Sequence, residues 1–305
     1  MKYYLYSAGL ILLAIIISIT TPILINAADR VFISIDIPEN NSNVAGIQKY
    51  NTPPISKGFP TPDTTARSVL ILDLASGKSL FEKEPDQKLP IASTTKIMTA
   101  LLANSYFKQN AILTVNDGAS IIGSKVGFNK GESLTFRSLL YGLLLNSGND
   151  AAYVIAENYP GGILGFVSAM NKEVIELDLK NTHFENPAGL DSPNHFSSAR
   201  DLSKITEHAL QDYQLARIFA TKDTEITSID KKYTYKLHNL NKLLASVVGV
   251  LGVKTGYSEN AKENLVTLVD REDHKILLVV LGSDDRFGET TGLIDWAYSN
   301  FAWQD

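Results

Sequence analysis

Two kinds of hydrophobic pattern alternate along the chain. Residues 68–74 form an apolar run typical of a buried strand, and residues 79–83 return after a turn at Ala75–Lys78, so the two predict a hairpin. Segments in which apolar residues have helical spacing follow, and strand patterns return later in the chain. The expected helices are 93–107, 136–145, 149–158, 164–179, 199–211, 213–220 and 290–301, and the expected later strands are 225–229, 233–238, 264–269 and 275–281.

The order of these elements predicts the fold class. Strands come first, helices fill the middle and strands return at the end, which indicates an α/β protein of the α+β kind. We expect one antiparallel sheet completed by both chain ends, flanked by helices, with a helical subdomain packed on it or beside it. One helix start is explicit, because Ser198 can cap a helix whose first turn carries Asp201.

The first 63 residues differ from the rest. An uncharged run from Tyr3 to Ala28 is long enough to span a bilayer, so residues 1–28 are expected to be a membrane anchor, or a signal segment that is cleaved. Residues 29–63 are rich in Pro, Asn and Ser and are expected to be a flexible linker, with a possible short strand at 31–35. Residues 64–305 are the expected catalytic domain, outside the cytoplasm in either case.

Composition excludes several classes of function. The chain has 305 residues, 44% of them hydrophobic, and a net charge of −5, so it has no basic character that would predict nucleic acid as a partner. It has no cysteine, which excludes disulfides and thiolate metal sites. None of the five histidines forms a metal-binding pair such as H-E-x-x-H, so no metal and no cofactor is expected.

Three short motifs that occur in one order along the chain are candidates for catalytic residues. Ser93-Thr94-Thr95-Lys96 is followed at domain-scale distance by Ser147-Gly148-Asn149 and then by Lys254-Thr255-Gly256. Ser-x-x-Lys also occurs at 105–108 and 228–231, but only the first has these companions at that spacing. Together the motifs supply a nucleophile, candidate bases and a carboxylate clamp, which suffices for acyl transfer through a serine ester.

Ser93 and Lys96 share one face of the expected helix, so the ammonium can reach the hydroxyl. A neutral Lys96 could take the serine proton if burial and a neighbouring cation lower its pKa. Taken alone, the pair is more simply interpreted as a helix cap and a solvated lysine, because serine is a common cap.

The other two motifs carry supporting roles. Ser147 could relay a proton to a leaving amine, and Asn149 could donate to a substrate carbonyl or hold Lys96, although the motif alone resembles a plain turn. Lys254, Thr255 and Gly256 lie where a strand pattern ends. They suit an extended peptide that ends in a carboxylate, and Lys254 would also help to drive the proton off Lys96.

These residues resemble a known family, the serine D-alanyl-D-alanine carboxypeptidases, which are low-molecular-mass penicillin-binding proteins. The resemblance runs from about Ala66 to the end and implies a β-lactamase/transpeptidase-like fold. The similar segments are residues 90–100, 145–152, 182–191, 195–202, 239–244, 252–257, 280–283 and 286–287.

The resemblance implies a role for each matching residue. Ser93 would be the acylated nucleophile and Lys96 its base, while Ser147 and Asn149 would assist proton transfer and position the substrate. The substrate-binding residues would be Lys254, Thr255, Gly256 and Arg286, and the backbone N–H groups of Ser93 and Tyr257 would form the oxyanion hole. The partners implied are a peptidoglycan stem peptide ending in D-Ala-D-Ala and β-lactams as inhibitors, with the membrane bound through the N-terminal segment.

Two features depart from the family pattern. The family usually has Ala-Gly where this chain has Ala261-Lys262, which leaves the geometry of that hairpin open. The sequence also stops soon after the last expected helix, so we expect the N-terminal segment to do the anchoring that a C-terminal helix does in many relatives.

Two rival functions remain open. A class A β-lactamase shares the motif logic but needs a glutamate that activates the deacylating water. No segment resembles the loop that would carry it, although the region between the second and third motifs offers Glu157, Glu173, Glu176, Glu185, Glu207 and Glu225. The second rival is a non-catalytic module that binds peptidoglycan or senses penicillin.

Overall fold

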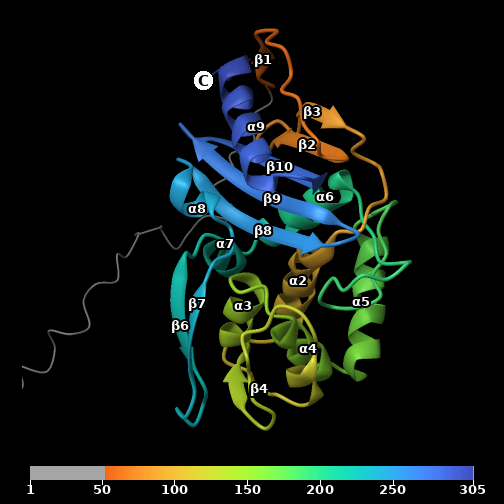
Figure 1. The fold of residues 1–305 in the computed structure, drawn as a ribbon, viewed down its shortest axis with the longest axis vertical. Coiled ribbons are helices and arrows are strands. Elements are labelled where there is room, and N and C mark those ends of the chain that lie inside the picture. The colour runs from red at the N-terminus through yellow and green to blue at the C-terminus, as the bar shows by residue number, and fades with distance from the viewer. Residues whose placement is uncertain (1–51, 305) are drawn as a thin grey trace, which may run out of the picture. The chain divides into compact units, whose positions relative to one another are not determined.

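The computed structural model describes residues 52–304, in which one five-stranded antiparallel sheet is the central layer (Figure 1). Its strand order is β3-β2-β10-β9-β8. The strands are β2 Ser68–Asp73, β3 Ser79–Lys83, β8 Val250–Ser258, β9 Lys262–Arg271 and β10 His274–Ser283. The expectation that both ends of the chain complete one antiparallel sheet is confirmed, because β2 pairs directly with β10.

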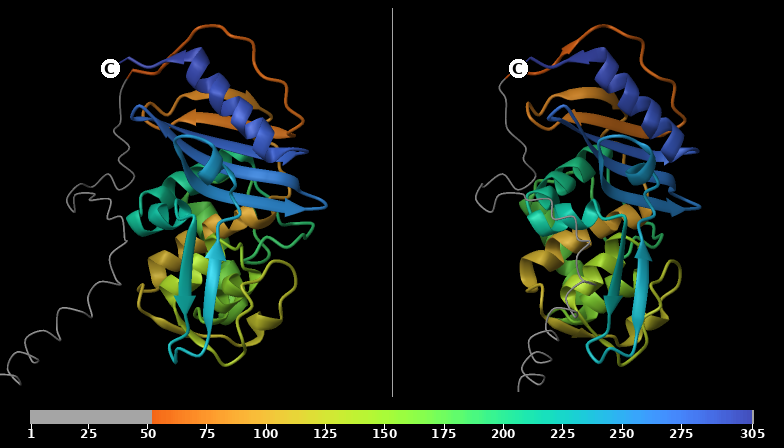
Figure 2. Two further views of the ribbon diagram at one scale, coloured as in Figure 1. Left: turned by 60° about the vertical axis from the view of Figure 1, so that its left-hand side comes forward. Right: turned by 90° about the vertical axis from the view of Figure 1, so that its left-hand side faces the viewer.

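Both faces of the sheet are buried, which explains the continuous apolar runs of its strands. On β10, Ile276, Leu278 and Val280 pack with helix α9 (Arg286–Asn300) on one face. Leu277 and Val279 point to the other face and join the core of the helical part. Figure 2 shows α9 on one side of the sheet and the other long helices on the opposite side.

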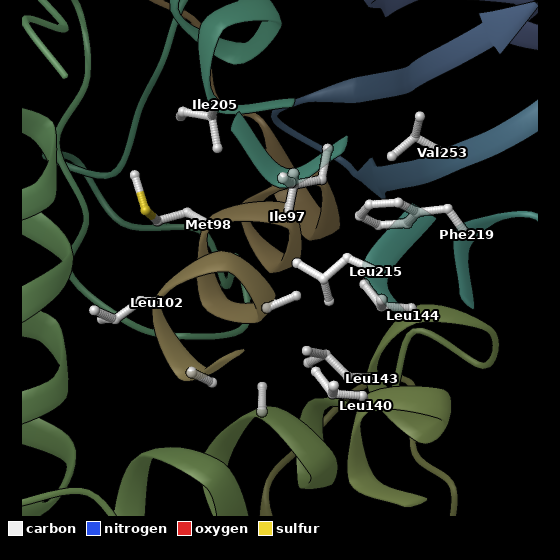
Figure 3. Packing of buried hydrophobic residues seen from close by; sticks show 14 of the residues in the cluster. Ile97, Met98, Leu102, Leu140, Leu143, Leu144, Ile205, Leu215, Phe219 and Val253 are labelled. Carbon is white, nitrogen blue, oxygen red and sulfur yellow. The ribbon is translucent and has the colours of Figure 1, made fainter. Parts of the chain in front are cut away.

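The helical part is assembled around α2 (Lys96–Tyr106), whose Ile97, Met98 and Leu102 lie at its centre (Figure 3). Leu140 and Leu143 of α3 pack against them. The other helices of this part are α3 Phe136–Leu144, α4 Asn149–Glu157, α5 Gly162–Glu176, α6 Ala199–Leu210 and α7 Tyr213–Phe219. The short helix α8 (Leu243–Ser246) packs through Leu243 and Leu244 with the core on the α9 face of the sheet. The Ser198 cap of α6 is confirmed, since its side chain accepts from the Asp201 N–H.

Three expected elements are corrected. The helix expected at 93–107 is a 3₁₀ turn, η1 (Ala92–Thr95), followed by α2. Both the N–H and the hydroxyl of Thr94 bond to the Ile91 carbonyl, which closes the tighter turn. The last helix begins at Arg286 rather than 290, because Asp285 caps it by accepting from Gly288 N–H.

The third correction concerns Lys254, which lies in the middle of β8 rather than where a strand ends. The strand continues because Thr255, Gly256 and Tyr257 pair with β9. The hairpin between β8 and β9 forms without the usual glycine, since Lys262 itself takes the left-handed conformation with φ of 58°.

The short strands form three further pairs. They are β4 Ile112–Thr114 with β5 Ser133–Thr135, β6 Asp223–Thr227 with β7 Thr234–His238, and β1 Ile55–Ser56 with β11 Phe301–Ala302. The β1–β11 pair corrects the linker boundary, which the sequence predicts at residue 63. The Lys57 N–H donates to the Asn300 carbonyl at 2.7 Å, and the Phe59 N–H donates to its side chain.

The expected anchor at residues 1–28, the linker as far as residue 51 and the possible strand at 31–35 lie outside the described residues. Among residues 52–304, no helix has both the length and the apolar character needed to cross a membrane.

Candidate active site

The first residue of the site, Ser93, lies in η1 directly before the first turn of α2. The hydroxyl is therefore presented from a turn whose neighbours are the free N–H groups of a helix N-terminus. Lys96, the first residue of α2, is completely buried, and its Nζ lies 2.8 Å from Ser93 Oγ. The i, i+3 contact predicted from the sequence thus forms, although across the junction of two helices instead of within one.

Two further oxygens hold Lys96 Nζ. They are Asn149 Oδ1 at 2.8 Å and the Ala188 carbonyl at 2.7 Å. Both can only accept hydrogen bonds, so a neutral amine donates its two N–H bonds to them. Its lone pair is then left for the third neighbour, the Ser93 hydroxyl. The geometry therefore suits a neutral Lys96 that accepts the serine proton.

Electrostatics favour this neutral state. Burial lowers the pKa of Lys96 well below its ordinary value of 10.5, and the positive charge of Lys254 lowers it further. Asp150 acts in the opposite direction, because its carboxylate stabilises the charged amine. Burial is the largest of these effects, and it acts because removing an ammonium from water disfavours its charged form.

The second motif forms the tight turn between α3 and α4, as the sequence predicts. Ser147 takes a left-handed conformation with φ of 58°, and Asn149 begins α4. The Asn149 amide is fixed at both ends, because its Nδ2 donates to the Ile122 carbonyl at 2.7 Å while its Oδ1 accepts from Lys96. Asp150 is fully buried and accepts from the N–H groups of Gly127 and other residues of the adjoining loop.

The third motif comes from β8, which is an edge strand of the sheet. Lys254 is only 2% exposed, and its Nζ donates to Ser147 Oγ and to the Thr255 carbonyl, each at 3.0 Å. Burial and the nearby Arg286 lower the pKa of Lys254 to about 7. Lys254 is therefore a buried residue of the site and not a lysine at the surface.

Gly256 carries the close approach between β8 and η1. A Cβ at this position would lie 2.9 Å from the Ile91 carbonyl oxygen and 3.3 Å from the Ser93 nitrogen. Any larger side chain would push the strand away from the nucleophile, which is the reason for glycine here. Arg286 also contacts Gly256, since its Nη1 donates to the Gly256 carbonyl at 2.8 Å. Tyr257 follows on β8, and its side chain is exposed.

The loop before α6 is a part of the site to which motif reasoning gave no role. Asn186 Oδ1 accepts from the N–H groups of Ala188, Gly189 and Leu190, which aims the Ala188 carbonyl at Lys96. Gly189 has φ of 84°, and a Cβ there would lie 1.9 Å from the Ala92 carbonyl oxygen. The Asn-Pro-Ala-Gly string is present in the sequence, but the group that contacts Lys96 is the Ala188 backbone carbonyl. Every residue has a backbone carbonyl, so the residue types do not predict this contact.

His195 ties this loop to the nucleophile turn. Its Nε2 lies 2.8 Å from Thr95 Oγ1, and its Nδ1 accepts from the Glu185 N–H at 3.1 Å. An accepting Nδ1 places the proton on Nε2, which then donates to the threonine. Burial lowers the pKa of His195 to about 4, so the ring is neutral at ordinary pH.

The other Ser-x-x-Lys strings form no such arrangement. Ser105 Oγ donates to the Leu102 carbonyl, and Ser228 Oγ donates to Asp230. One candidate glutamate for a β-lactamase mechanism is also engaged elsewhere, since Glu185 accepts from Ser192 and Asn194.

The site thus combines a serine hydroxyl on a buried lysine, a second serine–lysine pair and an edge strand, which are groups that acyl transfer through a serine ester can use. The family follows from comparison. Residues 56–285 match the Peptidase_S11 model, described as D-alanyl-D-alanine carboxypeptidase, and the chain belongs to this family.

Among curated relatives, the D-alanyl-D-alanine carboxypeptidase DacF of Bacillus subtilis is 34% identical over 77% of this chain and 63% of its own length. DacC of Escherichia coli is 33% identical over 79% of this chain and 63% of its own. The D-alanyl-D-alanine carboxypeptidase of Streptomyces sp. K15 is 32% identical over 78% of this chain and 89% of its own length. The chain thus spans under two thirds of the length of the first two.

A solved structure has the same fold. The crystal structure of the Streptomyces K15 DD-transpeptidase is 30% identical and superposes with a TM-score of 0.75, covering 79% of this chain and all of that one. The penicillin-binding/transpeptidase fold expected from the sequence is therefore confirmed.

Proposed function

We propose that this protein is a serine DD-carboxypeptidase that removes the terminal D-alanine from peptidoglycan stem peptides. The observation that carries the proposal is the 2.8 Å contact between Ser93 Oγ and a fully buried Lys96 whose other neighbours are acceptors. Family membership and the names of the relatives support the same substrate class.

In the acylation step, Ser93 Oγ attacks the carbonyl carbon of the penultimate D-alanine while its proton passes to Lys96 Nζ. The resulting oxyanion accepts from the backbone N–H groups of Ser93 and Tyr257. The C–N bond then breaks, and the leaving D-alanine nitrogen takes a proton delivered through Ser147, which Lys254 Nζ contacts at 3.0 Å. Water then attacks the Ser93 ester, giving the shortened peptide and the free serine.

The leaving residue carries a carboxylate, and we assign it to Thr255 of β8 and to Arg286 beside it. Arg286 suits this task, because its guanidinium can pair with a carboxylate through two donors while another stays on the Gly256 carbonyl. Lys254 acts at a distance, since its Nζ is already bonded to Ser147 and Thr255. The same serine would be acylated by β-lactams, whose ring amide takes the place of the peptide bond.

The test is mass spectrometry of the protein and its products after incubation with a pentapeptide ending in D-Ala-D-Ala, and separately with penicillin. We expect released D-alanine and a covalent penicillin adduct on the peptide that contains Ser93. A penicillin adduct without D-alanine release would favour a sensor over an enzyme. Adding an amine acceptor measures transpeptidation, the activity named for the Streptomyces K15 neighbour.

Arg286→Ala is expected to reduce kcat/KM on the free-acid peptide roughly ten- to a hundredfold, because charge-assisted hydrogen bonds contribute about 1.5–3 kcal/mol. A peptide with an amidated C-terminus lacks the charge and should be affected much less. Arg217→Ala, at an exposed arginine of α7, is the matched control. Equal losses on both peptides would mean that Arg286 acts through the fold of β8, whose Gly256 carbonyl it also contacts.

The rate of penicillin acylation is expected to fall as the pH falls, because Lys96 then gains a proton and can no longer act as a base. Lys254→Gln should move this acidic limb to higher pH. The charge of Lys254, present below about pH 7, lowers the pKa of Lys96, and its removal lets that pKa rise. Lys172→Gln, exposed on α5, should leave the limb unmoved. An unchanged limb in Lys254→Gln would refute the coupling.

We further propose that residues 1–28 hold the enzyme at the outer face of the cell membrane. The support is their sequence alone, which has no charge between Tyr3 and Ala28. The full-length protein is expected in the membrane fraction with its original N-terminus. A mature N-terminus at Ala28 or Asp29, with the protein free in the soluble fraction, would mean a cleaved signal instead.

A further inference from the structure

A polar cavity of about 570 Å³ lies far along the sheet from the nucleophile. Gly256, beside Ser93, pairs with Asn264 of β9, and the cavity begins seven residues further along this strand, at Arg271. At the rise of a strand this separation is roughly 24 Å. The volume of the cavity falls in the range of small-ligand sites, roughly 300–1,000 Å³. The cavity is therefore a candidate ligand site distinct from the site at Ser93.

Aromatic side chains at the end of α9 and beyond it form part of the cavity wall, namely Tyr298, Phe301 and Trp303. The Trp303 indole N–H donates to Asp73 Oδ1 at 2.9 Å, and its ring stacks on His274 with the two ring centres 5.0 Å apart. The Tyr298 hydroxyl donates to the His274 carbonyl at 2.7 Å. These contacts fix the rings in advance, so a ligand that packs on them orders few side chains.

The turn that borders the cavity has an unusual composition. Two residues, Glu272 and Asp273, join β9 to β10, and both have left-handed backbones, with φ of 54° and 64°. Two-residue hairpin turns of this kind prefer Asn-Gly or Asp-Gly, because positive φ disfavours most side chains. Glu272 lines the cavity, whereas Asp273 does not. Since such backbone strain is concentrated at functional sites, the position of Glu272 indicates a role in binding.

The charged groups of the cavity restrict the ligand. The Glu272 side chain is exposed, and within residues 52–304 no ion pair or hydrogen bond engages its carboxylate. Lys57 and Arg271 also line the cavity, and their positive charges disfavour a cationic ligand. Lys57 donates to the Ser299 carbonyl and keeps two further N–H donors. The ligand therefore offers neutral donors, such as hydroxyl or amide N–H groups, to Glu272 and an acceptor oxygen to Lys57.

We propose that this cavity binds the glycan strand of peptidoglycan through an N-acetylated amino sugar. Such a sugar presents hydroxyl and amide N–H donors to Glu272, a carbonyl oxygen to Lys57, and C–H groups to the electron-rich faces of the aromatic wall. The cavity holds the polymer while a stem peptide enters the site at Ser93, which raises the effective concentration of that peptide. This inference goes beyond the proposed function and takes from it only the identity of the polymer.

The first test is a titration of the full-length protein with peptide-free oligosaccharides of N-acetylglucosamine and N-acetylmuramic acid, followed by tryptophan fluorescence. The chain has two tryptophans, Trp296 and Trp303, of which Trp303 lines the cavity. We expect a saturable change, and binding about tenfold weaker or more in Glu272→Asn, which loses a charged acceptor. The same variant should melt at a higher temperature, because asparagine tolerates the left-handed conformation better than glutamate. A lower melting temperature with unchanged binding would mean that Glu272 serves the turn alone.

Asp273→Asn is the matched control, because it removes the same charge from the same turn but lies outside the cavity wall. It should bind the oligosaccharides as the wild type does. The second readout is kcat/KM for D-alanine release from two substrates. Glu272→Asn should lower it by up to about tenfold on stem peptides that are still attached to glycan, and leave it unchanged on the free pentapeptide.

The outcomes separate this inference from the proposed function. No saturable binding of the oligosaccharides by the wild type, or equal binding by Glu272→Asn, would overturn the sugar site. Saturable binding of inorganic phosphate with no response to the sugars would also overturn it, in favour of an anion site. The titration needs no turnover, so failure to release D-alanine from the free pentapeptide would count against the proposed function alone.

Discussion

Ser93→Ala is expected to abolish both the penicillin adduct and the release of D-alanine. The substitution removes the Ser93 Oγ atom that forms the ester, while the turn keeps the hydrogen bonds that the Thr94 N–H and the Thr94 hydroxyl donate to the Ile91 carbonyl. Activity should drop to the limit of detection, because without the nucleophile only positioning of the peptide remains. Intact-protein mass spectrometry with penicillin and a D-alanine assay would measure the two losses.

The chain provides a matched control for this change. Ser105 also starts a Ser-x-x-Lys string, but its hydroxyl bonds only to the Leu102 carbonyl at the end of α2. Ser105→Ala should therefore keep both the adduct and the turnover near wild type. A covalent penicillin adduct that persists in Ser93→Ala would assign the nucleophile to another residue.

Lys96→Arg is expected to be nearly inactive although it keeps a positive charge. Arginine stays protonated in proteins and cannot take the serine proton. Its larger planar group must also enter a fully buried space whose three oxygens are placed for a single amine nitrogen. Loss of a positioned base costs about 10²–10⁴-fold. Stopped-flow acylation by a fluorescent penicillin would measure the drop.

Lys108→Arg is the control, since Lys108 holds the equivalent position of the second Ser-x-x-Lys string. It should acylate at the wild-type rate. Circular dichroism and the melting temperature separate a folded, inactive Lys96→Arg from one that has lost its core. Acylation of a folded Lys96→Arg near the wild-type rate would show that Lys96 is structural and that another group takes the proton.

The sequence predicts best those elements in which the pattern of apolar residues follows directly from burial. The strands expected at 68–74 and 275–281 are found because both faces of β2 and β10 are covered, so nearly every residue is apolar. The sequence does not predict the change from the 3₁₀ turn η1 to the α-helix α2, because helical spacing of apolar residues continues through Ser93. The 3₁₀ turn is marked by a hydrogen bond to the Ile91 carbonyl, which no residue pattern records. Strand β1 has two residues and leaves no pattern at all.

The candidate site divides in the same way. Residues recognised by type and spacing, such as Ser93, Lys96 and Asn149, are brought together by the fold. What the sequence could not reveal is a backbone atom, the Ala188 carbonyl, and the burial of a lysine at position 254 in the middle of a strand. Both depend on contacts between distant segments, whereas a motif describes only its own neighbours.

The pairing of β2 with β10 has a consequence for how the chain acquires its structure. These two strands come from near the beginning and the end of the region that the structure describes, residues 52–304, and every helix of that region except α9 lies between them in sequence. Contacts so far apart in the chain slow folding, because the entropy of closing a long loop is lost before the two strands gain their pairing energy. The central sheet therefore cannot form until β10 has been synthesised. Until then β2 can pair only with β3, and its other edge stays unpaired. This is the stage at which the nascent protein is most exposed to aggregation.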